Sequence, residues 1–422
     1  MSNPFHSFDI SEKVYAFVKA QEQRIAPLFA EHRDICTANT MRIQEAFEHF
    51  RLSDGHFHWH TGYGYDDPGR EVIEKVYARI FGTEDALLRP GITSGTHAIT
   101  IMLKGILRPG DHLLSITGTP YDTLHGVIGI GVENDSTLKE FGIDYDEIPL
   151  REDGSFDREA IFKAITEDTK VIYLQRSQGY SFRPTFKFEE LEQLIKDLKA
   201  THPAMIIALD NCYGEFTLEL EPTHVGVDVL AGSLIKNPGG TLAPSGGYVV
   251  GTKELIRLIS HQLTSPALGK EVGGMFGLTR AILQGLYYAP HFVENAIKTA
   301  LLTAACFEAL RFEVFPKTQD QRLDIIQAVK IGSAQGVIDY CQAVQEGSPV
   351  DAFLTLEPWD MPGYQNQVIM AAGTFIQGAS LELSADAPIR EPFVVYQQGG
   401  VLYDQGQLVV MKVLEKLKLI ES

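Results

Sequence analysis

The chain has few of the residues that cross-link small or extracellular proteins. Its 422 residues include only 4 cysteines, which are Cys36, Cys212, Cys306 and Cys341. They are far apart in the sequence and form neither a CxxC pair nor a zinc-binding spacing. This usage argues against a disulfide framework and favours reduced thiols in a cytoplasmic protein.

Positive charge is also scarce. The 36 Lys and Arg residues are outnumbered by 55 Asp and Glu, which gives a net charge of −19. Such a surface repels phosphate backbones and argues against nucleic-acid binding. No apolar run reaches membrane-spanning length, and the first residues, "MSNPFHSFDISEKV", do not resemble a signal peptide. We therefore expect neither nucleic acid nor membrane as a partner.

Helical and strand patterns alternate from about residue 70. "GREVIEKVYARIFG" and "FEELEQLIKDLK" are amphipathic helices, whereas "HLLSI", "VIYLQ", "MIIALD" and "GYVVG" are short apolar strands. This alternation predicts an α/β fold with a mainly parallel sheet. Two helices are expected within residues 9–50, and a long helix followed by mixed structure after about residue 290. We expect an N-terminal helical segment (1–55), a large α/β domain (56–290) and a small α+β domain (291–422).

Polar residues follow several of these strands. Asp210 ends "MIIALD", Ser233 and Lys236 end "DVLAGSLIK", and Tyr121 follows "HLLSITGTP". "GITSGTHAI" opens a helix at Gly95–Thr96, where free backbone N–H groups can hold a phosphate. Ligands of parallel α/β sheets bind at the carboxyl ends of the strands, so these groups are expected to share one site.

These groups together favour a site for pyridoxal phosphate. A lysine can form a Schiff base with its aldehyde, and an aspartate can keep its pyridinium nitrogen protonated. A helix N-terminus can take the phosphate, and an aromatic ring can stack on the cofactor.

The same stretches resemble the fold-type-I pyridoxal-phosphate enzymes of cysteine and methionine metabolism. "GITSGTHAI" is similar to the "SGMAAI" loop of that family, "DNCYGEF" to "DNTFATP", and "GSLIK" to "SxTK". "DNCYGEF", "QRSQGY" and "LELSADAPIREPF" carry a narrower resemblance to its methionine gamma-lyase-like branch, the aluminium-resistance proteins. The resemblance implies an aspartate aminotransferase-like fold, with a large sheet of seven strands and a smaller C-terminal domain.

The resemblance also implies roles for individual residues. Lys236 would bind the cofactor covalently, Asp210 would pair with its ring nitrogen, and Tyr121 would stack on the ring and serve as an acid for the leaving group. Arg390 in "APIREPF" is the candidate for the substrate carboxylate, with Arg176 as the alternative. The cofactor phosphate and ring would be held by Ser94, Gly95, Thr96 and Ser233.

Three departures from the family pattern affect this assignment. Ile235 replaces the threonine that usually precedes the lysine. The Tyr-x-Arg that a neighbouring subunit supplies becomes "GYGYDDPGR", in which Tyr63 or Tyr65 could provide the tyrosine. "QRSQGY" replaces an Asn-Pro, so that Gln178 or Arg176 could face the cofactor instead. The exact substrate and leaving group therefore remain open.

The function expected from these residues is a carbon–sulfur lyase that acts on a sulfur amino acid by β- or γ-elimination. A sulfhydrylase or aminotransferase on the same scaffold is the first alternative, because fold alone does not fix chemistry. A non-catalytic cofactor-carrying or metal-tolerance protein is the second. The three histidines of "HFHWH" suggest no metal, because no acidic or thiol partner stands at a telling distance. The family resemblance implies a homotetramer made of two active dimers.

Overall fold

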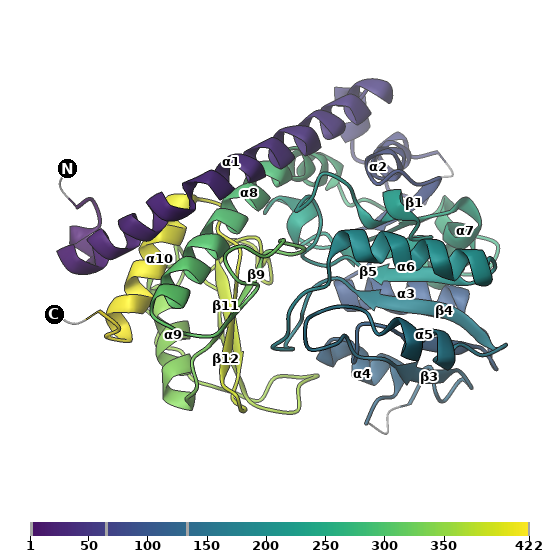
Figure 1. Cartoon of the computed structure of the whole chain (residues 1–422). Coiled ribbons are helices and arrows are strands. Elements are labelled where there is room, and N and C mark those ends of the chain that lie inside the picture. The colour runs from purple at the N-terminus through teal and green to yellow at the C-terminus, as the bar shows by residue number, and fades with distance from the viewer. Residues whose placement is uncertain (1–2, 64–65, 132–134, 421–422) are drawn as a thin grey trace.

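The computed structural model describes residues 3–63, 66–131 and 135–420, and its secondary structure falls into two sheets with helices around them (Figure 1). The larger sheet has seven strands in the order β1-β7-β6-β5-β4-β2-β3. Its strands are β1 (Asp85–Arg89), β2 (His112–Ser115), β3 (Asp144–Glu147), β4 (Thr169–Gln175), β5 (Ile206–Asp210), β6 (Val229–Ser233) and β7 (Gly247–Gly251).

Six of the seven strands of the larger sheet run in the same direction, and only β7 is reversed. Strands β6, β5, β4, β2 and β3 pair in parallel, whereas β7 is antiparallel to both β6 and β1. The mainly parallel sheet predicted from the sequence is thus confirmed. The carboxyl ends of β5 and β6, which carry Asp210 and Ser233, lie side by side.

Helices cover both faces of the larger sheet, as its nearly continuous apolar strands require. One face packs against α2, α5 and α6, and the other against α3, α4 and α7. These helices are α2 (Pro68–Ile80), α3 (Gly95–Ile106), α4 (Asp122–Ile128), α5 (Arg158–Ala164), α6 (Phe188–Thr201) and α7 (Lys253–Leu263).

The smaller sheet has five strands in the order β10-β11-β12-β9-β8, all antiparallel. Helices α8, α9 and α10 pack beside it (Figure 1). Its elements are α8 (Thr279–Ala309), β8 (Val314–Phe315), β9 (Ile326–Lys330), α9 (Ala334–Glu346), β10 (Val368–Ala371), β11 (Ser384–Pro388), β12 (Val394–Gln398) and α10 (Tyr403–Lys416).

The N-terminal region differs from its prediction. The two helices expected within residues 9–50 form one helix, α1 (Glu12–His49), which begins at the N-cap Ser11 and continues through Pro27. A proline removes one hydrogen bond from a helix interior. The buried face of α1 packs along α8 (Figure 1). This packing offsets the hydrogen bond lost at Pro27, so the helix is not interrupted there. Within the described residues, no helix is both long and apolar enough to cross a membrane.

Candidate active site

Four of the polar positions predicted from the strand ends line one cavity of about 220 Å³ at the carboxyl edge of the larger sheet. Asp210 closes β5, Ser233 closes β6, and Lys236 follows three residues later. Tyr121 enters the same cavity from the start of α4. A parallel sheet brings these side chains together because the carboxyl ends of its strands share one edge.

The N-terminus of α3 forms one wall of this cavity. Ser94 is its N-cap, with its hydroxyl accepting a hydrogen bond from the His97 N–H at 3.0 Å. Gly95 begins the helix, and a Cβ atom at that position would lie 2.8 Å from Cys212 Sγ. Thr96 shares a hydroxyl hydrogen bond of 2.7 Å with Thr123. The first N–H groups of a helix lack intrahelical partners, so this wall can hold an anion such as a phosphate.

Asp210 also lines the cavity, in a buried environment that disfavours its charged form. It is 5% exposed, and its Oδ1 accepts a hydrogen bond from the Cys212 N–H at 3.0 Å. Burial raises the pKa of Asp210 to about 6, although that hydrogen bond and the Lys236 charge act in the other direction. No lysine or arginine of the described residues forms an ion pair with this carboxylate, so a cationic ligand would stabilise it.

Lys236 stands between the two sheets. Its Nζ donates hydrogen bonds to Ser380 Oγ and, at 3.4 Å, to the Gly378 carbonyl. The same nitrogen lies 4.6 Å from the centroid of the Tyr213 ring. Burial lowers the pKa of Lys236, but Tyr213, Cys212 and Asp386 together raise it above its ordinary value. The cation is therefore held by groups from both parts of the chain.

Tyr121 is fixed at its backbone and at its hydroxyl. Its N–H donates to Gln175 Oε1 at 2.7 Å, and its hydroxyl lies 2.7 Å from that of Tyr364. The Tyr180 ring packs edge-on at 5.3 Å between centroids. Burial raises the pKa of Tyr121 well above its usual value, so the phenol holds its proton at neutral pH.

A second compartment of about 120 Å³ adjoins the first. It shares Tyr121, Tyr213, Lys236 and Tyr364 with the cavity above. The rest of its lining comes from the smaller sheet and from the loop between β10 and β11, and includes Met370, Thr374, Ser380, Ser384, Asp386 and Gln398. Tyr213 belongs to "DNCYGEF", and Ser384 and Asp386 belong to "LELSADAPIREPF", but no local pattern in these stretches marks the three residues as ligand-binding.

The segment after β4 presents different residues from those chosen from the sequence. Gln175 and Ser177 line the cavity. Gln178 lies outside the lining, where its amide donates to the Phe315 carbonyl at 3.3 Å. Gln175 is the last residue of β4 and the chain bends at Arg176 and Ser177, so the strand pattern does not determine which of these side chains face the cavity.

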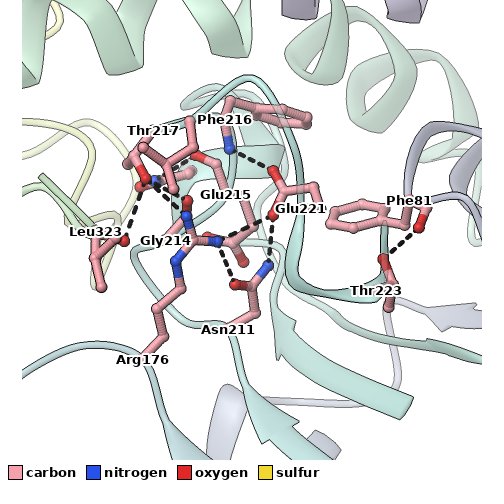
Figure 2. Close-up of polar contacts among 12 residues, drawn as sticks. Phe81, Arg176, Asn211, Gly214, Glu215, Phe216, Thr217, Glu221, Thr223 and Leu323 are labelled. Atoms are coloured by element: carbon pink, nitrogen blue, oxygen red, sulfur yellow. Dashed lines mark hydrogen bonds and ion pairs between the residues drawn. The ribbon is translucent and has the colours of Figure 1, made fainter. Parts of the chain in front are cut away.

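Arg176, the alternative candidate for a substrate carboxylate, lies in a buried network away from the cavity lining (Figure 2). Its guanidinium donates to Asn211 Oδ1 at 2.8 Å, to Glu221 Oε2 at 3.1 Å and to Thr217 Oγ1 at 3.0 Å. Glu221 also accepts hydrogen bonds from Asn211 Nδ2 and from the Phe216 N–H. These contacts hold the loop that follows Asp210 and leave Arg176 occupied within the protein interior.

Arg390 and Tyr63 lie outside the lining of the cavity. Arg390 stands in the turn after β11, 39% exposed, with Nη1 3.4 Å from Asn366 Oδ1 and 3.9 Å from Asp122 Oδ2. Tyr63 is 85% exposed, and Tyr65 lies outside the described residues. Arg70 of the same segment is buried in its own chain, where Nη1 donates to the Gly62 carbonyl at 3.3 Å.

Comparisons with known proteins agree with this architecture. The model of the family described as methionine gamma-lyase matches residues 14–418. The uncharacterized protein YnbB of Bacillus subtilis (strain 168) is 47% identical over 397 residues, which cover 94% of each chain.

Two solved structures extend the comparison. A carbon-sulfur lyase involved in aluminum resistance from Clostridium novyi NT superposes with a TM-score of 0.93 at 43% identity, covering 99% of this chain and 98% of its own. A cystathionine gamma-lyase from Lactobacillus plantarum, complexed with L-serine, has a TM-score of 0.57 at 17% identity and covers 84% of this chain and 88% of its own. The latter similarity shows the shared fold alone, and the fold-type-I architecture predicted from the sequence is confirmed.

Proposed function

The chain belongs to the methionine gamma-lyase family of carbon–sulfur lyases, and from this premise we propose that it uses pyridoxal 5′-phosphate to eliminate a thiol from a sulfur amino acid. The observation that carries the proposal is the shared cavity, in which Lys236, Asp210 and the N-terminus of α3 meet. These are a primary amine, a buried acid and an anion-binding helix end, the three groups that this cofactor requires.

Two features of the cavity support the fit of the cofactor. Asp210 is a buried carboxylate with a raised pKa, and a protonated pyridine nitrogen would give it the ion-pair partner that it lacks among the described residues. Gly95 leaves open the approach to the N–H groups of α3, because any side chain there would press on Cys212. Ser94, Thr96 and Ser233 would add hydroxyl donors for a phosphate, and Tyr121 an aromatic face for the ring.

Each residue of the site would have a separate role in the proton transfers of an elimination. Pyridoxal phosphate, when bound, supplies an electron sink for the pair left at the substrate α-carbon. Asp210 would accept the N–H of the ring nitrogen and hold that proton in place. Lys236 Nζ, which lies where the two compartments meet, would take the α-proton in its uncharged amine form. Tyr121 keeps its phenol proton at neutral pH and would pass it to the departing sulfur.

We assign the substrate carboxylate to Arg390. A guanidinium can bind a carboxylate through two parallel hydrogen bonds. Arg390 stands beside Asp122, next to Tyr121, and its contacts of 3.4 and 3.9 Å leave it less firmly held than Arg176. Its side chain therefore has the freedom to turn toward a substrate.

We further propose that two copies of the chain complete each site. Tyr63 is almost fully exposed, and Trp59 and Phe276 nearby in the structure are each 65% exposed. Exposed aromatic residues of this kind favour an interface. A homotetramer of two active dimers would bury them, with the segment that contains Tyr63 and Tyr65 reaching the neighbouring site.

The activity assay tests the proposal directly. Purified protein reconstituted with pyridoxal phosphate is incubated separately with L-cysteine, L-cystathionine and L-methionine, and release of pyruvate, 2-oxobutyrate and ammonia is followed. A 2-oxo acid and ammonia in equal amounts identify elimination, whereas amino transfer to an added 2-oxo acid without ammonia identifies an aminotransferase. Lys236→Ala is the matched control. Absence of 2-oxo acid from every sulfur amino acid would contradict the proposal.

A further inference from the structure

The second compartment contains one ionisable group that the proposed chemistry does not use. Asp386 lies in the middle of β11, between Met370 of β10 and Tyr396 of β12. It is 7% exposed and lines the compartment that begins at Lys236. A molecule held at Lys236 thus has this carboxylate in the adjoining space.

The charge of Asp386 is poorly balanced by the protein. The Gln398 side-chain amide donates to Oδ2 at 3.2 Å, and that amide also donates to Ser384 Oγ at 3.2 Å. No lysine or arginine in the described part of the chain forms an ion pair with Asp386. Burial raises the pKa of Asp386 to about 6 even though the Lys236 charge acts in the other direction. A buried carboxylate without an ion-pair partner is stabilised by a cationic ligand that binds it directly.

Lys236 does not fill this role in the structure. It is the one lysine or arginine among the described residues that line the compartment, and its Nζ donates instead to Ser380 Oγ and the Gly378 carbonyl. The other polar lining groups are hydroxyls and amides, such as those of Thr374, Ser384 and Gln398. The compartment therefore offers an anion and neutral donors to the side chain of a substrate.

We propose that Asp386 makes this compartment select sulfur amino acids whose leaving thiol carries an ammonium group. The inference rests on the proposed lyase function and names its substrate class, the aminoalkyl thioethers of cysteine or homocysteine. The distal ammonium would lie against the Asp386 carboxylate and form a charge-assisted hydrogen bond with it. A substrate that ends in a methyl group cannot form this bond and would bind less tightly. A distal carboxylate of the substrate would be repelled by the Asp386 carboxylate. Apart from Lys236, no lysine or arginine of the described lining could bind it.

Matched ligands of nearly equal size test this selection. S-(2-aminoethyl)-L-cysteine and S-propyl-L-cysteine differ in one terminal group, and kcat/KM for each is measured by pyruvate release. L-lysine and L-2-aminoheptanoic acid are the corresponding pair without a leaving group, and their Kd values are measured by calorimetry on the holoenzyme. We expect the cationic member to be favoured about tenfold or more in both pairs, as an ion pair in a dehydrated site predicts.

Asp386→Asn keeps the shape of the side chain and removes its charge, and both ratios should fall to about one. A wild-type ratio near one in the calorimetric pair would overturn the inference, whether or not the variant folds. Equal losses for both members in the variant would also overturn it, because Asp386 would then act on Lys236 or on the fold. If no substrate is cleaved but lysine binding still depends on Asp386, the lyase proposal fails while the charge selection holds.

Discussion

The hydroxyl oxygens of Tyr121 and Tyr364 lie 2.7 Å apart, although 243 positions separate the two residues in the chain. Tyr121 precedes α4 beside the larger sheet, whereas Tyr364 belongs to the segment before β10 of the smaller sheet. Both rings line the two adjoining compartments. The hydrogen bond therefore links the two parts of the structure at the place where a leaving group would depart.

Tyr364→Phe should slow the step in which the leaving group departs. If Tyr121 gives its proton to sulfur, the Tyr364 hydroxyl can donate to the phenolate that remains. Loss of a hydrogen bond to a charged group predicts a fall of about tenfold in kcat. Exchange of the substrate α-proton with deuterium, measured by NMR, serves as the internal control and should be unchanged. An equal loss in exchange and in elimination would mean that Tyr364 acts through packing alone.

Lys236→Ala should abolish covalent attachment of the cofactor. Wild-type protein incubated with pyridoxal phosphate is expected to be yellow, and borohydride reduction should leave a pyridoxyl group on the peptide that contains Lys236. Mass spectrometry of the digested protein locates the label. Lys330→Ala, at a partly exposed surface ion pair with Glu313, is the control and should retain the label on Lys236. A label on any other lysine of the wild-type protein would contradict the assigned site.

Asp210→Asn should stabilise the cofactor-free protein as the pH rises. Burial raises the folded-state pKa of Asp210 to about 6, above its unfolded value. A carboxyl with a raised pKa destabilises the fold where it is charged, so the penalty grows from about pH 4 and is complete above about pH 6. Asparagine can still accept the Cys212 N–H bond and carries no charge.

Denaturant unfolding at several pH values checks this expectation. Near pH 8 the cofactor-free variant should exceed the wild type by about 1–3 kcal/mol, with a smaller difference toward pH 5. Added pyridoxal phosphate should stabilise the wild type more than the variant, because the aspartate then has its cation. A variant that is less stable at every pH without cofactor would disprove the argument.

The proposed assembly predicts a tetramer in solution. Light scattering of the purified protein should give four times the mass of 46.8 kDa. Trp59→Asp, at a 65% exposed aromatic position, should weaken association between copies by introducing charge into an apolar contact. Phe353→Asp, at an 83% exposed position outside this surface, is the matched control. A wild-type monomer with full cofactor content would rule out a shared site.

The large sheet and one wall of the site could be predicted from the sequence because they depend on local patterns. Asp210, Ser233 and Lys236 follow apolar strands, and the carboxyl ends of parallel strands share an edge. The direction of β7 could not be predicted in this way, because an apolar run gives a strand but not its pairing. The continuity of α1 past Pro27 likewise depends on its packing against α8.

The other wall of the site depends on contacts between distant segments. Asp386 and Tyr364 come from the smaller sheet and the loop before it, and neither stands in a pattern that marks a ligand-binding residue. In "LELSADAPIREPF" the pattern predicts a role for Arg390, whereas Asp386 is the residue that lines the compartment. The sequence does not show which side chains near the end of β4 face the cavity, and Gln175 and Ser177 line it in place of the predicted Gln178 and Arg176.

Arg390→Lys tests the assignment of the substrate carboxylate. A lysine keeps the charge but cannot form two parallel hydrogen bonds, so KM should rise about tenfold for every amino acid that the enzyme accepts. Pro388 and Pro392 frame the turn and restrict its backbone, which limits the entropy lost when the side chain orders. Cofactor content should be unchanged, because Arg390 lies outside the lining of both compartments. Arg151→Lys, at a surface ion pair with Asp157, is the control and should leave KM unchanged.

If Arg390→Lys and Arg390→Ala both keep the wild-type KM, Arg390 serves its contacts with Asp122 and Asn366 alone. The carboxylate would then be bound by neutral donors of the lining, since the guanidinium of Arg176 is occupied by Asn211, Thr217 and Glu221.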